Sequence, residues 1–289
     1  MKRPALEIGL LFLGAGLAVS AAAPVPGAPA RENGLDPAQI VRDASWNELH
    51  AHGGAHPFRF RLSKQDAKGS NLKEIVETKE GDVARLLEKD GHPLSPEEEQ
   101  AEMDRLNNLL AHPEIQEHRF KKEQEDSAHG DEMVRLLPDA FLYTADGTVQ
   151  APGGPCYRLR FKPNPAYAPP DREAEVFRGM EGELWVDQGQ KRLVRLDAHL
   201  TSDVNFGWGV IGRLYKGGSI LVEDADVGMG HWETLHMQLN LKGKILLMKS
   251  VDFSTTEDAS EFHSVPPEIG YRQAVQLLKH SAGPQMAQR

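Results

Sequence analysis

Apolar and polar side chains alternate with a period of two over much of the chain, which predicts β-strands with one buried face. One such segment runs from Met180 to Leu200, where Leu184 and Val186 alternate with Trp185. A polar tetrapeptide with one glycine, Asp187 to Gln190, interrupts the pattern and predicts a tight turn between two antiparallel strands. We therefore expect this hairpin to lie in the middle of one long antiparallel sheet.

The same alternation predicts strands on both sides of this hairpin. Two further turns are expected, at Asp146-Gly147 and at Lys242-Gly243-Lys244, because each places a glycine between apolar runs. The clearest of these further strands are Phe58 to Leu62, Cys156 to Phe161 and Leu235 to Leu241.

Between residues 95 and 137 the period changes to that of amphipathic helices. Ser95 and Glu98 form an S-x-x-E capping box with a proline at the first helical position. We predict three helices here: one that ends at His112, a very polar one over Glu114 to Asp126, and a short one over Asp131 to Leu137. The block is a helical insertion between strands.

One more helix is expected at each end of the strand region. Asp36 followed by Pro37 places a capping side chain and a proline at a helix start. The two glycines of HAHGGAHP end this helix. The last helix runs from about Pro267 to His280, where Tyr271 and Leu278 share one apolar face.

The first residues are typical of an export signal. Lys2 and Arg3 precede an apolar run from Ile8 to Val19, and small residues follow it, so we expect a cleaved signal peptide over residues 1–22. Residues 23–35 form a flexible leader, and residues 283–289 a disordered tail. No cysteine stands near the cleavage region, so a lipid-attachment box is absent. The prediction is a periplasmic or secreted protein without stable membrane insertion.

The charge of the chain argues against two classes of partner. Its 289 residues carry 33 Lys and Arg against 43 Asp and Glu, a formal net charge of -10. Nucleic acids and anionic membranes attract basic patches, so we expect neither as a partner.

Two clusters contain residue types that can bind a metal ion. One contains three histidines and lacks further nearby ligands apart from Glu48, and the other has three acidic residues without the spacing of a calcium loop. For both, ordinary solvated side chains are the better interpretation, and no metal or cofactor is expected. The clusters are His50, His52 and His56, and Glu223, Asp224 and Asp226.

No local motif of a hydrolase, a nucleotide-binding loop or a zinc protease occurs in the chain. Cys156, the only cysteine, lies on the same side of its strand as Arg158 and Arg160, which could lower its pKa, yet a plain unpaired thiol is the better interpretation. We predict no enzyme and no catalytic residue. A triad of residues distant in sequence stays open as an alternative.

The segment GELWVDQGQKRLVRL, Gly182 to Leu196, resembles a strand-turn-strand of the LolA-like superfamily of lipoprotein carriers, and the order of elements is similar too. The resemblance implies an α+β fold over residues 36–282. In it a strongly curved antiparallel sheet forms an incomplete β-barrel, and the insertion over about residues 95–137 forms a helical lid. It also implies an apolar concave cavity that carries acyl chains across the periplasm. The acidic helical segment and the loop from Pro163 to Pro170 depart from the carriers.

The sheet needs its concave face filled, and the predicted helices are few and mostly polar, so part of that face is expected to bind lipid or an acylated protein. The alternative from another class is an envelope sensor or protein-binding module without lipid. The predicted lipid-binding residues are the apolar members of the alternating strands: Phe58, Phe60, Leu62, Phe141, Tyr143, Tyr157, Leu159, Phe161, Leu184, Val186, Leu196, Leu235, Met237, Leu239 and Leu247.

Overall fold

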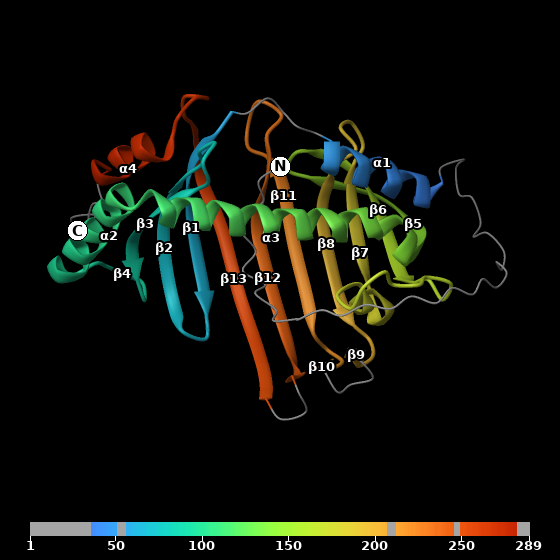
Figure 1. The fold of residues 1–289 in the computed structure, drawn as a ribbon. Coiled ribbons are helices and arrows are strands. Elements are labelled where there is room, and N and C mark those ends of the chain that lie inside the picture. The colour runs from blue at the N-terminus through green and yellow to red at the C-terminus, as the bar shows by residue number, and fades with distance from the viewer. Residues whose placement is uncertain (1–35, 51–55, 207–211, 246–248, 282–289) are drawn as a thin grey trace, which may run out of the picture.

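A computed structural model of the chain describes residues 36–50, 56–206, 212–245 and 249–281. Within these residues, thirteen strands form one antiparallel sheet that stays open instead of closing into a barrel (Figure 1). Neighbouring strands follow the order β4, β3, β2, β1, β13, β12, β11, β8, β7, β6, β5, with β9 and β10 attached beside β12. The strands are β1 (Phe58–Asp66), β2 (Gly69–Val76), β3 (Val83–Lys89), β4 (His92–Pro93), β5 (Phe141–Ala151), β6 (Gly154–Pro163), β7 (Met180–Asp187), β8 (Leu193–Leu200), β9 (Val204–Phe206), β10 (Gly212–Leu214), β11 (Ser219–Asp226), β12 (Trp232–Ile245) and β13 (Lys249–Ser264).

The helices complete an α+β fold, and the predicted fold class is confirmed. No helix of the described residues is both long enough and apolar enough to cross a membrane. The signal peptide, the leader and the disordered tail fall outside the described residues and stay predictions. The helices are α1 (Pro37–His50), α2 (Pro96–Ala111), α3 (Pro113–Ala140), a 3-10 helix η1 (Ala174–Gly179) and α4 (Tyr271–Lys279).

The hairpin of β7 and β8 forms as predicted. Leu184 pairs with Leu196 across the ladder, and the turn follows Asp187. The Asp187 side chain accepts a hydrogen bond from the Gln190 N–H, and its carbonyl accepts one from the Lys191 N–H at 3.0 Å. Lys191 adopts a left-handed φ of 50°. The acidic residue therefore holds the turn through its side chain and its backbone, as Asp does in many turns.

The turn predicted at Asp146-Gly147 is wrong. These two residues form a bulge inside β5, because the register with β6 shifts between Ala145 and Thr148. Gly147 takes a positive φ of 87°, which suits a bulge as well as it suits a turn. The chain reverses instead over residues 152–153, a proline and a glycine, where Ala151 pairs with Gly154. A proline presets the φ of a turn residue.

The turn predicted at Lys242 to Lys244 is also wrong, because β12 continues through these residues. Gly243 pairs with Val251 of β13 on one side and with Leu214 of β10 on the other. A Cβ at Gly243 would stand 2.3 Å from the carbonyl oxygen of Arg213. The glycine permits a close approach of two strands here. The connection to β13 lies at residues 246–248, outside the described residues.

The helical insertion consists of two helices and not three. The capping box at Ser95 is present: its hydroxyl accepts from the Glu98 N–H at 3.2 Å, and Glu98 accepts from the Ser95 N–H at 3.0 Å. The predicted break before Asp131 is wrong, because α3 continues through Gly130 as one helix of 28 residues. A glycine inside a helix costs only about 1 kcal/mol relative to alanine, and contacts at both ends of α3 outweigh that cost.

Two hydrophobic clusters fix the helices to the sheet. At one end, Val76 and Val83 pack with apolar residues of α2 and α4. Ile75 pairs with Phe60 and must lie on the opposite face from Val76, because consecutive strand residues point to opposite faces. At the other end, α1 and the last turns of α3 pack on β5 to β8, with Leu184 fully buried among them.

Candidate functional site

The candidate site is the face of the sheet that α3 crosses in Figure 1. Residues directly opposite each other in neighbouring strands share a face. Successive strand partners therefore define a row of side chains across the sheet, which starts in the hydrophobic cluster under α1 and α3. The row is apolar over β6 to β12 and becomes charged on β13 and β1. We call the face that carries it the inner face. The row runs through Leu159, Leu184, Leu196, Val222, Met237, Glu257 and Lys64.

A second row lies beside the first on the inner face. Gly182 stands in it directly opposite Ala198. A Cβ at Gly182 would lie 2.1 Å from the carbonyl oxygen of Asp197, so only glycine fits where β7 approaches β8. This second row runs through Tyr143, Phe161, Gly182, Ala198, Ile220, Leu239 and Thr255.

Most of the predicted lipid-binding residues belong to the packed core at the β5 to β8 end. They contact Ile40, Val41 and Ala44 of α1 and Leu137 of α3. The Tyr143 hydroxyl donates a hydrogen bond to the Leu137 carbonyl at 2.7 Å. The residues brought together here are Phe141, Tyr143, Leu159, Phe161, Leu184 and Val186, with Tyr157 and Leu196 partly buried against them.

The centre of the inner face is apolar and lies outside this core. Met237 and Leu239 on β12 and Phe60 on β1 are buried, yet they belong to none of the three hydrophobic clusters found among the described residues. Phe60 stacks on Phe262 of β13, with ring centroids 5.0 Å apart. Leu62 is half-buried on the same strand face as Phe60. These residues are the part of the predicted set that lies between the two ends of the sheet.

Three predicted residues remain to be placed. Leu235 is the extra residue of a bulge, because Glu223 pairs with His236 and Asp224 already pairs with Thr234. Phe58 lies at the start of β1, where its ring is 4.8 Å from that of His231. Leu247 lies outside the described residues.

The first row ends in an ion pair between β1 and β13. Lys64 Nζ lies 2.9 Å from Glu257 Oε1, and the exposed fractions of the two side chains are 17% and 8%. The Thr255 hydroxyl, two residues away on β13, is buried without a hydrogen-bond partner among the described residues. The inner face thus offers apolar side chains on β8, β11 and β12 and, with Phe60 and Leu62, on β1, beside the polar groups Lys64, Thr255 and Glu257 of β1 and β13.

Hydrogen bonds near the start of α3 and packing at its C-terminal end hold it in place, and the residues between the two ends are mostly polar. Near its start, the Gln116 amide donates to the Glu80 carbonyl at 3.0 Å, and Glu123 accepts from the Asp82 N–H at 3.0 Å. Between the two ends, its half-buried positions include Ser127. Of the insertion expected as a lid, only α3 crosses the inner face, because α2 packs with α4 on the opposite side of β2 and β3.

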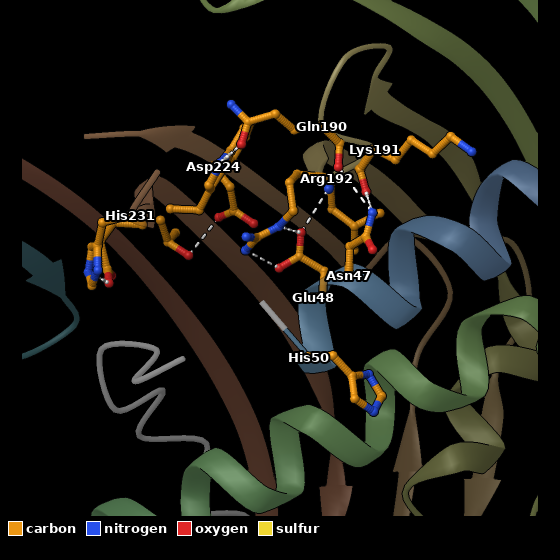
Figure 2. Close-up of polar contacts among 12 residues, drawn as sticks. Asn47, Glu48, His50, Gln190, Lys191, Arg192, Asp224 and His231 are labelled. Atoms are coloured by element: carbon orange, nitrogen blue, oxygen red, sulfur yellow. Dashed lines mark hydrogen bonds and ion pairs between the residues drawn. The ribbon is translucent and has the colours of Figure 1, made fainter. Parts of the chain in front are cut away.

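α1 is clamped to the β7–β8 turn by a buried ion pair, shown in Figure 2. Arg192 donates from Nε and Nη2 to the two carboxylate oxygens of Glu48, each at 2.8 Å. Glu48 also accepts from the Leu193 N–H at 2.9 Å. The Arg192 guanidinium lies 5.3 Å from the ring centre of Trp232. Glu48 therefore joins α1 to β8.

Neither metal cluster considered in the sequence forms in the described residues. His50 stacks on Trp46, with ring centroids 3.5 Å apart, and His52 lies outside the described residues. Glu223 pairs with Arg195, whereas Asp224 accepts from the Thr234 hydroxyl. Glu223 and Asp224 diverge because consecutive strand residues point to opposite faces, and the Asp226 side chain accepts a hydrogen bond from the Gly228 N–H at 2.8 Å.

A different cluster brings together Glu77, His231 and Glu233. Their ligand atoms lie within 4.8 Å of one another, and both glutamates are buried. His231 Nε2 lies 2.7 Å from Glu233 Oε1, and this hydrogen bond raises the pKa of His231. Sequence reasoning missed the cluster because Glu77 follows β2 while the other two residues lie at the start of β12. No local spacing connects them.

Cys156 is buried, and its Sγ lies 3.6 Å from the Gly154 carbonyl. Burial, and then the nearby Asp187 carboxylate, raise the pKa of this thiol, whereas Arg158 and Arg160 both pair with Asp146. Only the thiolate reacts readily. We expect iodoacetamide to modify the native protein at pH 8 far more slowly than the urea-unfolded protein, as followed by intact mass. Equal rates in the two states would contradict this account.

Comparison of the sequence with known proteins finds no match. No family model matches the chain, and no curated protein matches it.

Solved structures give matches at low identity. A LolA superfamily protein from Nitrosomonas europaea is 10% identical, with a TM-score of 0.29, over 80% of this chain and 96% of its own. A putative outer membrane lipoprotein-sorting protein domain from Vibrio parahaemolyticus is 9% identical, with a TM-score of 0.34, over 85% and 100%. MucB in complex with MucA is 11% identical, with a TM-score of 0.24, over 78% and 94%.

These TM-scores are low, so the description of the fold rests on the strand order and pairings of this chain. One of the solved structures to which the chain is similar is a member of the LolA superfamily, the family that the segment Gly182 to Leu196 resembles.

Proposed function

We propose that this protein binds the acyl chains of a lipid or an acylated protein on the inner face and carries them outside the cytoplasm. The observation that carries the proposal is the apolar stretch from Leu196 through Val222 to Met237, which continues beyond the packed core. The helix that crosses this face, α3, packs against α1, η1 and β5 near its end and against α2 near its start. An acyl chain is the apolar partner that this stretch of sheet would take.

The chemistry of the inner face supports an amphiphilic ligand. Burial of an acyl chain contributes about 0.8 kcal/mol per methylene, so a chain of ordinary length supplies enough free energy for stable binding. The ion pair of Lys64 and Glu257, with the Thr255 hydroxyl beside it, offers donors and acceptors to a polar headgroup. The contacts proposed for the acyl chain are Phe60, Leu62, Leu196, Met237 and Leu239.

The location proposed for this activity is the periplasm or the cell exterior. It rests on the predicted signal peptide over residues 1–22 and on the lack of a cysteine near its end. N-terminal sequencing of the protein from an envelope fraction tests this part. A mature start near residue 22 supports export, and an intact Met1 in the cytoplasm contradicts it.

Lipid binding is tested with two neighbouring residues of β11 that point to opposite faces. Val222 lies on the inner face opposite Met237, and Leu221 lies on the outer face opposite Gln238; both are half-buried. We expect Val222→Glu to raise the dissociation constant of a fluorescent fatty acid about tenfold or more, because the carboxylate must be desolvated beside the ligand. Leu221→Glu should leave the constant unchanged.

Two measurements accompany this comparison. Thermal unfolding of both variants establishes that they fold, and mass spectrometry of lipids extracted from the natively purified protein identifies the natural ligand. The proposal is abandoned if no lipid co-purifies and no probe binds the wild-type protein. An equal effect of both substitutions also contradicts it, since only one of them changes the inner face.

The alternative function is an envelope module that binds a protein. Its supporting observation is Trp46 of α1, which is 61% exposed although tryptophan is usually well buried. A single stoichiometric partner captured from envelope extract by the wild type, and lost in Trp46→Ala, favours this alternative. For enzymatic activity we propose no residue, since the raised pKa of Cys156 opposes a role as nucleophile.

A further inference from the structure

We propose that Glu77, His231 and Glu233 form a binding site for a divalent transition-metal ion, with zinc as the ion that best fits the donors. One imidazole nitrogen and two carboxylate oxygens meet within 4.8 Å. Glu77 directly follows β2, His231 directly precedes β12 and Glu233 lies at the start of β12, so an ion would join parts of the sheet that are distant in sequence. The site is separate from the acyl-binding residues proposed above.

The donors select the class of ion. Imidazole together with carboxylates suits zinc, cobalt and manganese, whereas calcium and magnesium sites are built from oxygens alone. With a neutral imidazole, the two glutamates carry two negative charges, which a divalent cation balances. Glu77 is 6% exposed and Glu233 4% exposed, so both carboxylates are largely removed from water.

The position of Glu77 is set by the backbone of β1. The Phe58 N–H donates to Glu77 Oε2 at 2.7 Å, and the Glu77 N–H donates to the Phe58 carbonyl at 2.9 Å. A hydrogen bond of this kind orients a ligating carboxylate in metal sites. The carboxylate of Glu77 therefore points toward His231 without needing a rearrangement of the strand.

The position of His231 is set by an unusual turn between β11 and β12. Gly228, Met229 and Gly230 all have positive φ, of 122°, 61° and 75°. The His231 N–H donates to the Gly228 carbonyl at 3.0 Å, and the Val227 N–H donates to the His231 carbonyl at 2.8 Å. A left-handed conformation is uncommon for methionine, and such backbone conformations concentrate at functional sites.

An ion requires only a small change of side chains. His231 Nε2 and Glu233 Oε1 are 2.7 Å apart and share a hydrogen bond. Ligand atoms bound to zinc at about 2.0–2.2 Å in a tetrahedron stand roughly 3.3 Å apart, so the glutamate must rotate slightly and give up this hydrogen bond. Three protein ligands leave the fourth position for water, which is the arrangement of an open zinc site.

The test uses the untagged full-length chain, stripped with a chelator and titrated with zinc chloride in a calorimeter. We expect one ion per chain. Glu233→Gln and His231→Ala should each weaken zinc binding about tenfold or more, since even an outer-shell partner of a metal ligand is worth that much. Cobalt(II) provides a second readout, because its visible absorption reports the number and type of ligands.

Two control variants address zinc binding elsewhere. His236→Ala removes another histidine of β12, whose Nδ1 lies 2.7 Å from Asp258 Oδ1, and it should leave the zinc affinity unchanged. A double variant, His50→Ala with His56→Ala, tests whether the histidines near the end of α1 hold the ion. Circular dichroism confirms that each variant is folded.

The results separate the possibilities. One ion lost in the Glu233 and His231 variants, and kept in both controls, supports the site. No zinc bound by the wild type, a loss in His236→Ala equal to that in His231→Ala, or binding abolished only by the double variant would overturn it. Glu77→Gln keeps the shape of the side chain, so a folded Glu77→Gln protein with unchanged zinc affinity also overturns the three-ligand assignment.

Discussion

Replacing Glu48 with alanine is expected to lower the free energy of unfolding by about 3–5 kcal/mol, the largest effect of a single substitution that we anticipate. The substitution leaves the Arg192 guanidinium buried, with its side chain 5% exposed, after two hydrogen bonds of 2.8 Å are lost. It also removes the acceptor of the Leu193 N–H. Urea unfolding followed by tryptophan fluorescence measures the change.

An exposed ion pair between the same two elements provides the control. Asp43 of α1 lies 2.5 Å from Lys191 of the β7–β8 turn, and their side chains are 31% and 47% exposed. Asp43→Ala is expected to cost at most about 1 kcal/mol, because water screens exposed pairs. The account fails if the two substitutions destabilise the protein equally.

A double variant distinguishes the loss of the Glu48–Arg192 ion pair from the cost of leaving one buried charge without its partner. Glu48→Leu with Arg192→Met removes both charges and keeps apolar volume. We expect it to be more stable than Glu48→Ala, because an uncompensated buried charge causes most of the loss in the single variant. If the double variant is as unstable as Glu48→Ala, packing and not charge governs this contact.

Gly182→Ala is expected to destabilise the protein by about 1–3 kcal/mol or more, the range for a side chain forced into a filled space. A Cβ at this position would lie 2.1 Å from the Asp197 carbonyl oxygen and 2.8 Å from the Ala198 Cα. These are backbone atoms of β8, so they do not move aside as a flexible side chain would. Separation of β7 from β8 would also disturb the inner face.

Gly153→Ala is the matched control for this glycine. A Cβ there meets no atom within 4 Å, and its φ lies outside the left-handed region. An alanine at such a position restricts the unfolded chain and costs little in the folded one, so stability should stay the same or rise slightly. Urea midpoints of the two variants, measured side by side, check the prediction, and a similar loss in both would contradict it.

The sequence predicted the hairpin of β7 and β8 well because its information is local. Apolar alternation defines a strand with one buried face, and the Asp187 turn follows from residues that are adjacent in the chain. Glycine was the misleading residue: at Gly147 it allows a bulge, and at Gly243 it allows the approach of β10. A turn, a bulge and a close contact all use the same lack of a side chain.

For the candidate site, too, local sequence predicted one part and the tertiary structure decided the other. Alternation identified Leu196, Met237 and Leu239 as members of a buried face. It did not separate them from Leu159 and Leu184, which pack under α1 and α3, because hydrophobicity is the same in a filled core and on a binding surface. That distinction depends on which helix lies above each strand.

By itself, then, the sequence determined the class of the fold, the apolar alternation of the main strands, the capped start of α2 and the central hairpin. Only the tertiary structure decided that α2 and α3 cover opposite faces, that Glu48 pairs with Arg192, and that Glu77 meets His231. The physical reason is that each of these contacts joins side chains many residues apart, whose approach is set by the strand order of the whole sheet.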